Sequence, residues 1–247
     1  MSEFPSLSSF LRKFLHVLFP STCAQCKAPL WDDPVPFVCR DCWATVVPIS
    51  TPCCPHCGGP FSSPVALDHS PMHTCGACRT KPLAFTQAWS VFPYQSPLKE
   101  AIIGFKYHGK RSLTKPFLQA MIPALPTLPT IDVLMPIPLH AKRLREREYN
   151  QSLLLAHGLS QHLRIPLLVS CLLRVRETAP QTSLSRADRL TNLHRAFAVK
   201  EASKIKGQCI LLIDDVYTTG TTLHECAKVL RKAGSGSVYG LTLARML

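Results

Sequence analysis

One stretch of this sequence, LLIDDVYTTGTT at residues 211–222, combines residue types suited to binding a phosphorylated sugar. Asp214 and Asp215 follow an apolar run, residues 210–213, which predicts a strand buried on both faces. Beyond the threonines around Gly220, apolar residues recur at helical spacing. The stretch therefore joins the end of a strand to the start of a helix, where unpaired N–H groups and the helix dipole favour an anion.

The loop and the two acids together indicate a ribose 5-phosphate. Gly220 lets the backbone approach a phosphate closely, and hydroxyl donors come from Thr218, Thr219, Thr221 and Thr222. A carboxylate beside an anion site repels the anion unless it binds another group of the ligand. Asp214 and Asp215 are suited to accept hydrogen bonds from the two ribose hydroxyls. Neither a Walker-type loop nor a GxGxxG fingerprint occurs in the sequence.

A second set of reactive residues lies near the N-terminus, where four CxxC pairs follow one another. The eight cysteines are Cys23, Cys26, Cys39, Cys42, Cys54, Cys57, Cys75 and Cys78. This spacing predicts two structural zinc ions, each held by four thiolates, rather than disulfides or a single redox pair. So short a segment has little core of its own, so its folding should depend on the metal.

The sequence leaves some ligand choices open. The pairs can be used in order or cross-braced, and Cys53 can replace Cys54, although Cys54 completes the better pair. Weaker ligand candidates are His56, His69 and His73. The cysteines expected in the core are Cys171, Cys209 and Cys226.

The formal charge of +13 is carried by one part of the 247-residue chain. Five basic and five acidic side chains cancel in residues 1–80, so residues 81–247 hold the excess. Zinc thiolate clusters would lower the total to about +9. Any electrostatic contact with nucleic acid should therefore come from residues 81–247, although a small polyanionic ligand explains the charge equally well. No apolar run approaches the roughly 20 residues of a membrane span.

Three regions follow from these patterns. Residues 1–22 predict an amphipathic helix that packs on the protein, with a helix on a membrane surface as the alternative and a signal peptide disfavoured. Residues 23–80 form the zinc module. Residues 81–247 read strand, helix, strand, helix, polar segment, strand, helix, strand, which predicts a mostly parallel α/β sheet with ligands at the strand C-termini.

The acidic and threonine-rich stretch resembles the phosphoribosyl-diphosphate (PRPP) motif of type I phosphoribosyltransferases. The whole chain resembles the ComF/ComFC branch of competence proteins, including proteins labelled GntX, in which a double zinc ribbon precedes a phosphoribosyltransferase-like domain. The resemblance implies a type I phosphoribosyltransferase sheet, PRPP bound with Mg²⁺, and two structural Zn²⁺ ions. In this sequence Asp214 and Asp215 would hold the ribose, and residues 218–222 the 5-phosphate.

The resemblance extends to two further segments. Lys142 and Arg143, after the second predicted strand, would hold the diphosphate. ComF-like proteins often show Arg-Gly-Phe-Asn-Gln where this chain has residues 147–151, so Glu148 replaces a glycine. A flap over the diphosphate is implied by Arg174, Arg176, Thr178, Gln181, Arg189, Asn192 and Phe197. Such a flap would exclude water from the sugar carbon.

Three functions follow from the resemblance and the composition. The first is a PRPP-binding protein of natural transformation that handles incoming single-stranded DNA in the cytoplasm or at the inner face of the membrane. Its partners would include other competence proteins, such as a DNA-translocating helicase. The second is an active transferase of nucleotide metabolism, whose acceptor the sequence does not identify. The third is a scaffold that docks a partner through its zinc module.

Overall fold

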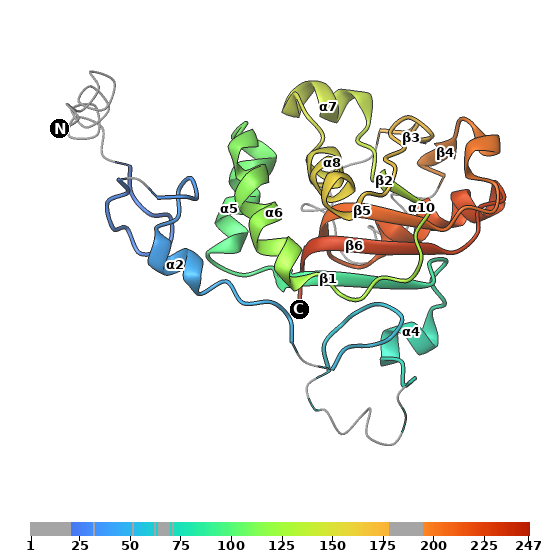
Figure 1. Cartoon of the computed structure of the whole chain (residues 1–247), viewed down its shortest axis with the longest axis horizontal. Helices are drawn as coiled ribbons and strands as arrows, with labels where there is room; N and C mark the ends of the chain where they lie inside the picture. The colour runs from blue at the N-terminus through green and yellow to red at the C-terminus, as the bar shows by residue number, and fades with distance from the viewer. Residues whose placement is uncertain are drawn as a thin grey trace. The chain divides into compact units, whose positions relative to one another are not determined.

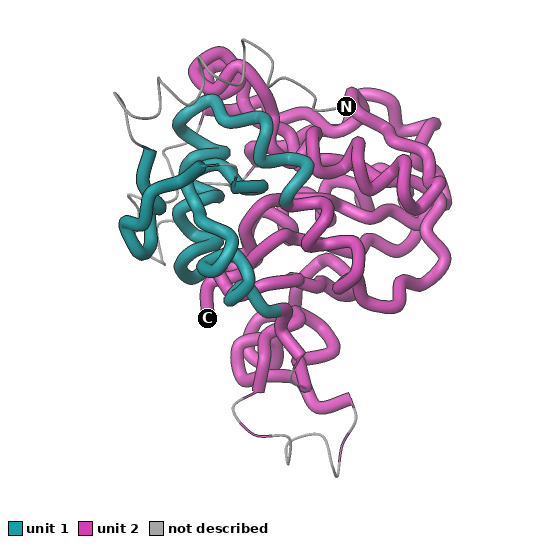
Figure 2. Tube along the Cα trace, turned by 60° about the vertical axis from the view of Figure 1, so that its left-hand side comes forward, with its two compact units in different colours: residues 1–47, 95–116 teal, residues 48–94, 117–247 magenta. Residues whose placement is uncertain are grey.

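The computed structural model describes residues 21–31, 33–50, 52–61, 63, 70, 72–177 and 195–247. These residues divide between two compact units, one up to Val47 together with 95–116, the other from Pro48–Tyr94 together with Phe117–Leu247 (Figure 2). Among them, no helix is both long and apolar enough to cross a membrane. The predicted N-terminal helix falls almost wholly on residues 1–20, outside this description.

The second unit is built on a four-stranded sheet with the strand order β1-β6-β5-β2 (Figure 1). Every neighbouring pair is parallel, which confirms the mostly parallel α/β sheet predicted from the sequence. The strands are β1 (Gln87–Pro93), β2 (Val133–Pro136), β5 (Ile210–Tyr217) and β6 (Val238–Arg245). Because all four run the same way, their C-terminal ends share one edge of the sheet.

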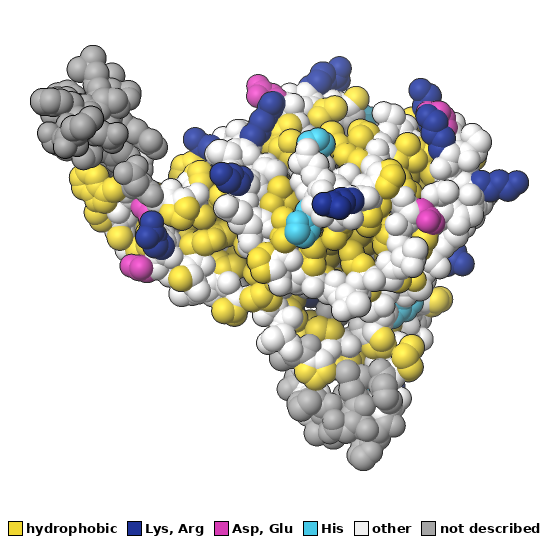
Figure 3. All heavy atoms as spheres, in the orientation of Figure 1, with side chains coloured by type: hydrophobic (Ala, Val, Ile, Leu, Met, Phe, Trp, Pro, Cys, Tyr) yellow, Lys and Arg dark blue, Asp and Glu magenta, His cyan; other side chains and the backbone are white. Residues whose placement is uncertain are grey.

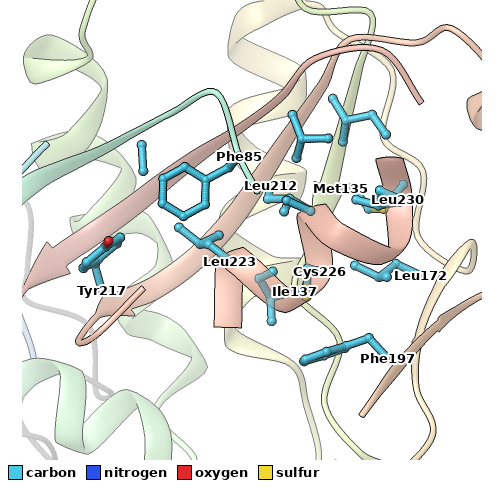
Figure 4. Close-up of a cluster of buried hydrophobic side chains, with 14 of the residues drawn as sticks. Phe85, Met135, Ile137, Leu172, Phe197, Leu212, Tyr217, Leu223, Cys226 and Leu230 are labelled. Atoms are coloured by element: carbon cyan, nitrogen blue, oxygen red, sulfur yellow. The ribbon is translucent and has the colours of Figure 1, made fainter. Parts of the chain in front are cut away.

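The centre of the sheet is buried on both faces, as a parallel sheet requires. Residues Ile210 to Ile213 of β5 are all fully buried. Helix α10 (Thr221–Lys232) contributes Leu223 and Cys226 to a core cluster with Leu212 of β5 (Figure 4). Helix α8 (Gln151–Leu163) packs against β2 and β5.

Strand β5 runs further than the sequence predicted. The apolar run ends at Ile213, but parallel pairing with β6 continues as far as Tyr217 opposite Arg245. Asp214 and Asp215 therefore lie within the strand instead of after it. The neighbouring strand holds the backbone extended there, which overrides the weak strand preference of two aspartates.

The single helix predicted after the second strand is wrong, because the structure has two. Helix α7 (Ala141–Arg147) stops at Glu148, which has a left-handed backbone with φ of 64°. Asn150 then caps α8 by accepting a hydrogen bond from the Ser152 N–H at 3.0 Å. A left-handed residue followed by a new N-cap ends one helix and starts another.

The ends of the proposed flap lie side by side. Strand β3 (Leu172–Arg174) pairs antiparallel with β4 (Phe197–Val199), and Arg174 lies opposite Phe197. The remaining flap candidates after Arg176, namely Thr178, Gln181, Arg189 and Asn192, fall outside the described residues.

The first unit contains a cysteine-rich segment and helix α5 (Leu98–Tyr107), which buries Ile102 and Phe105. The Lys110 ammonium lies 4.9 Å from the centre of the Phe37 ring. The other helices among the described residues, with α6 shared between the units, are α2 (Arg40–Ala44), α4 (Gly76–Thr80), α6 (Thr114–Met121) and the 3₁₀ turns η1 (Arg111–Leu113), η2 (Ile122–Ala124) and η4 (Ala202–Ile205).

Candidate functional site

The eight predicted cysteine ligands form two separate clusters. The thiols of Cys23, Cys26, Cys39 and Cys42 all lie within 4.8 Å of one another, and so do those of Cys54, Cys57, Cys75 and Cys78. The pairs are therefore used in order and are not cross-braced. Cys53 belongs to neither cluster, and neither do His56 and His73, whereas His69 lies outside the described residues.

Both clusters have the geometry of a four-thiolate zinc site. The sulfurs of Cys26 and Cys39 are 3.6 Å apart, and those of Cys57 and Cys75 are 3.7 Å apart. Four sulfurs at 2.3 Å from a tetrahedral zinc ion would be separated by about 3.8 Å. Backbone N–H groups donate to the cluster sulfurs at 3.4 Å, from Cys39 to Cys23 and from Cys75 to Cys54. The clusters fit two structural zinc ions.

These N–H donors favour the thiolate form of one cysteine in each cluster. Burial alone would raise the pKa of Cys23, but hydrogen bonds from backbone N–H groups stabilise the thiolate and bring the pKa to about 6. The pKa of Cys54 is lowered to about 7 in the same way, against the effect of burial. Thiolates are the form that binds zinc, so the local backbone prepares each cluster for the metal.

The remaining cysteines and one histidine have other roles. Cys171 and Cys226 are buried, as predicted, but Cys209 is only partly buried because it precedes β5. His56 Nε2 lies 2.9 Å from the Phe85 carbonyl oxygen, and its ring packs edge-on against the Phe85 ring. His56 is thus a packing residue of the second unit.

The two acids lie at the C-terminal edge of the sheet, next to the start of α8. Asp214 Oδ1 accepts hydrogen bonds from Ser152 Oγ and from the Asp215 N–H, both at 2.9 Å. Asp215 is buried, with 7% of its surface exposed, and Asp214 is half-buried. Asn150 Nδ2 donates to the Ile137 carbonyl at 2.9 Å, which fixes the start of α8 beside the end of β2.

The threonine loop, residues 218–222, follows directly; Gly220 is the residue before α10, and Thr221 and Thr222 form the first turn of that helix. Gly220 has φ of 75°, and a Cβ there would lie 2.7 Å from Cζ of Tyr217, so only glycine fits. The hydroxyls of Thr219 and Thr221 lie 2.8 Å apart. The loop therefore places hydroxyl groups next to the N–H groups at the start of a twelve-residue helix, an arrangement that binds phosphate.

The basic side chains after β2 are engaged in ion pairs. Lys142 Nζ lies 2.6 Å from Glu177 Oε1, and Arg143 Nη1 lies 2.9 Å from Glu146 Oε2. The hydrogen bond with Glu177 raises the pKa of Lys142, and the same bond lowers the pKa of Glu177. His140 lies at the end of this turn and caps α7 by accepting from the Lys142 N–H at 3.4 Å.

Sequence reasoning assigned no role to Ser152, Tyr217 or Arg245, and the structure brings all three to the edge that carries the acids and the loop. Ser152 lies two residues after the helix N-cap Asn150, and this capping residue could have placed Ser152 at the start of a helix. The other two end strands β5 and β6, and no local pattern marks them. At the same edge, Arg147 Nη1 donates to Gln151 Oε1 at 3.1 Å.

Of the described aromatic residues beside basic ones at 105–107 and 147–149, one is exposed enough to stack on a nucleic-acid base. Phe105 and Tyr149 are buried, whereas Tyr107 is 52% exposed. The ring of Phe197 packs beneath Arg174, whose Cζ lies 5.7 Å from the ring centre. Burial lowers the pKa of Arg174.

Comparison with known proteins follows the same division of the chain. Residues 14–79 match the double zinc ribbon domain, and residues 150–245 match the phosphoribosyl transferase domain. Competence protein F of Haemophilus influenzae is 34% identical over 203 residues, 79% of this chain and 86% of the relative. The DNA utilization protein YhgH of Escherichia coli is 31% identical, over 92% of this chain and 98% of the relative. Competence protein ComFC of Bacillus subtilis is 32% identical, over 84% of each.

These relatives cover most of the chain, and the matched domains contain the cysteine clusters and the acidic, threonine-rich edge described above. The fold is accordingly that of a double zinc ribbon joined to a type I phosphoribosyltransferase sheet. The chain belongs to the ComF/ComFC family of competence proteins.

Proposed function

We propose that this protein binds PRPP with Mg²⁺ and acts in the handling of incoming single-stranded DNA during natural transformation. Asp214 and Asp215 hold the ribose hydroxyls, and the loop Thr218, Thr219, Gly220, Thr221 and Thr222 holds the 5-phosphate. Lys142 and Arg143 hold the diphosphate, with Mg²⁺ between the diphosphate and the ribose hydroxyls. The site lies at the C-terminal ends of parallel strands, where α/β folds bind their ligands.

The observation that carries the proposal is the position of two acids beside a phosphate-binding loop. Carboxylates this close to an anion site repel the anion unless they bind another part of the same ligand. Ser152 Oγ donates to Asp214 Oδ1 and so orients the carboxylate at the edge of the sheet. A ribose 5-phosphate presents hydroxyls and a phosphate together, and so meets both requirements.

Diphosphate binding requires a change of partners at the basic turn. Lys142 and Arg143 are paired with Glu177 and Glu146, and the Lys142 pair is about half exposed to solvent. Exposed pairs of this kind are worth about 0–1 kcal/mol, so a diphosphate with Mg²⁺ can replace the carboxylates at little expense. We therefore expect Glu146→Gln and Glu177→Gln each to raise the affinity for PRPP about twofold.

Calorimetric titration of PRPP and Mg²⁺ into the full-length, zinc-loaded protein tests the proposal. Wild type should bind, and the double variant Asp214→Asn/Asp215→Asn should lose at least about tenfold in affinity. Asp132→Asn is the matched control, because Asp132 Oδ2 also accepts a backbone N–H, from Cys209 at 2.7 Å, but at the N-terminal end of the strands. A double variant that binds like wild type would remove the acids from the site.

The DNA-handling part of the proposal rests on the family and on charge. The relatives are named as competence and DNA utilization proteins. The chain carries a formal charge of +13, and basic side chains are more widespread than acidic ones on the face drawn in Figure 3. The full chain should bind a fluorescent single-stranded oligonucleotide with an affinity that falls steeply with salt. Failure to bind at physiological salt contradicts DNA handling but leaves PRPP binding standing.

An active phosphoribosyltransferase is the second candidate, supported by the match to that domain over residues 150–245. Diphosphate release separates it from simple binding. Protein that binds PRPP but releases no diphosphate in the presence of nucleobases or single-stranded DNA uses PRPP as a ligand. Release that is lost in Asp214→Asn/Asp215→Asn identifies an enzyme, and the compound that triggers it identifies the acceptor.

A further inference from the structure

The second cysteine cluster and the threonine loop face the same cavity within the second unit. The cavity has a volume of about 460 Å³. Cys57, Cys75 and Cys78 line one part of it, and the loop residues Thr218 and Thr219 line another. Open space therefore separates much of the cluster from the loop, and a side chain that spans the space is well placed to connect them.

Arg245, the last residue of β6, makes that connection. Its guanidinium donates from Nη1 to the carbonyl oxygen of Cys57 at 2.7 Å. Its Cζ lies 4.4 Å from the centre of the Tyr217 ring, a cation–π contact. Arg245 is 7% exposed, and among the described residues that line the cavity there is no aspartate or glutamate. Burial of the guanidinium strengthens both contacts.

The Tyr217 ring contacts both Arg245 and the threonine loop. It is the last residue of β5, and its ring packs directly beneath Gly220, which leaves room for no side chain there. The Tyr217 carbonyl accepts a hydrogen bond from the Met246 N–H at 2.9 Å, which holds both strand ends together. Figure 4 shows Tyr217 beside the turn that leads into α10. The ring therefore sets the position of the glycine that shapes the phosphate site.

The cluster fixes the other end of the connection. The Gly58 N–H donates to the Cys54 carbonyl and the Cys54 N–H to the Gly59 carbonyl, both at 2.8 Å, so a metal at the thiols holds the turn that contains Cys57. We propose that Arg245 is a positioning residue that couples the second zinc cluster to the threonine loop. Binding at the loop thus depends on zinc at the second cluster. The ligand side of this inference rests on the proposed PRPP site.

Substitution of Arg245 tests the connection without touching a metal ligand. The full chain, zinc-loaded, is compared as wild type, Arg245→Met and Arg245→Lys. We expect Arg245→Met to keep two zinc ions but to lose about tenfold in PRPP affinity, and Arg245→Lys to recover part of the loss. Lys110→Met is the matched control, because it also removes a cation over an aromatic ring, Phe37, but in the first unit. It should leave PRPP affinity unchanged.

Hydrogen exchange of the amides of residues 217–222 provides a readout that needs no ligand. Protection should fall about tenfold in Arg245→Met, while amides in the middle of β5 and β6 keep theirs. If wild type binds no PRPP but exchange changes in this way, the proposed function fails and the coupling stands. Unchanged exchange at the loop in Arg245→Met overturns the coupling, and so does an equal loss across the whole sheet, which would indicate a general structural role.

Discussion

Lys27 in the first cysteine cluster and Gly58 in the second occupy the same place, directly after the first CxxC pair, and both have left-handed backbones with φ of 64° and 69°. Their N–H groups make the same hydrogen bond, from Lys27 to Cys23 and from Gly58 to Cys54. One position tolerates a lysine and the other holds a glycine. The metal-binding turn is thus common to both clusters, and the difference comes from what packs outside it.

The second cluster is built into the sheet of its unit. A Cβ at Gly58 would overlap the carbonyl oxygen of Ala88 in β1. The Ala88 N–H donates to the His56 carbonyl at 2.9 Å, and Arg245 donates to the Cys57 carbonyl. In the first cluster, Lys27 has room for a full side chain, whose Nζ donates to the Ala24 carbonyl at 3.1 Å. The same zinc-binding turn therefore packs against the sheet in the second cluster, whereas in the first cluster the residue at this position contacts its own segment.

Removing one ligand from each cluster should give the largest difference. Cys78→Ser should lower the free energy of unfolding of the second unit by roughly 3 kcal/mol or more, because the metal and the sheet contacts are lost together. Cys42→Ser should destabilise the first unit. It should change the free energy of unfolding of the second unit by no more than about 0.5 kcal/mol. Trp89 stacks on Tyr239 in the sheet, so denaturant unfolding followed by Trp89 fluorescence measures the free energy of unfolding of the second unit.

The controls for this comparison are zinc content and a second reporter. Each variant should retain one of two zinc ions, measured by native mass spectrometry. A variant with phenylalanine at Trp31 and Trp43 leaves only Trp89 as a reporter, and Trp89→Phe leaves only the tryptophans of the first unit. Equal effects of both cysteine variants on the Trp89 transition would show that the two clusters contribute equally to the stability of the second unit.

Gly58→Ala should have the next largest effect. The new Cβ would meet the Ala88 carbonyl and would require a left-handed backbone of a residue that disfavours it. We expect a loss of about 3 kcal/mol in the second unit, measured by the Trp89 transition with two zinc ions still bound. Gly109 provides the matched control, because it also has a positive φ, of 64°, but a Cβ there meets no atom within 4 Å. Gly109→Ala should cost about 1 kcal/mol, from the backbone alone.

The features that sequence reasoning predicted are those that need fixed residue types at short, fixed spacing. Structural zinc sites commonly take four thiolates from two CxxC pairs, and a strand, a glycine turn and a helix are each marked by their own residues. Both are local, so both can be read from residues 23–78 and 211–222. Alternation of strands and helices likewise predicted the parallel sheet, since each apolar run had only one consistent placement.

The features that sequence reasoning missed depend on partners that are distant in the chain. Ser152 and Asp214 are 62 residues apart, and Arg245 and Cys57 are 188 residues apart, so no local pattern could pair them. The extension of β5 beyond Ile213 comes from its pairing with β6. Packing decides these cases, because a neighbouring strand can override the weak intrinsic preference of a short segment.

Acid should lower the free energy of unfolding of the second unit through His224. This residue lies in α10 and contacts Ala84, in the segment that follows the second cluster. His224 Nδ1 accepts the Ala84 N–H at 3.0 Å, so the imidazole is neutral. Burial lowers the pKa of His224 below its usual 6.5; Glu225 opposes this shift, and Lys81 and Lys228 add to it. The unfolded chain therefore takes up the proton first as pH falls. The unfolding free energy should decrease below about pH 6.5 and stop decreasing once folded His224 is also protonated.

The measurement is the Trp89 transition between pH 7.5 and 5.5, with zinc content determined at each pH. His224→Asn keeps an acceptor near the Ala84 N–H but does not titrate, so its unfolding free energy should vary less with pH than that of wild type. Identical pH profiles for wild type and His224→Asn would assign the acid sensitivity to other groups, the zinc thiolates first among them.

The smallest effect should appear at Lys27, where glycine and alanine can be compared directly with the same pair at position 58. Both substitutions remove the Lys27 to Ala24 hydrogen bond, so the difference between Lys27→Gly and Lys27→Ala reports the left-handed backbone alone. Lys27→Gly should be more stable than Lys27→Ala by about 1 kcal/mol, measured in the Trp89→Phe background by the fluorescence of the first-unit tryptophans. At position 58 the corresponding difference should be about 3 kcal/mol, because alanine also meets the Ala88 carbonyl. The remaining 2 kcal/mol or so is then the part of the glycine requirement that the sheet imposes. Equal differences at both positions would mean that the turn alone selects glycine, and that the lysine of the first cluster is tolerated for another reason.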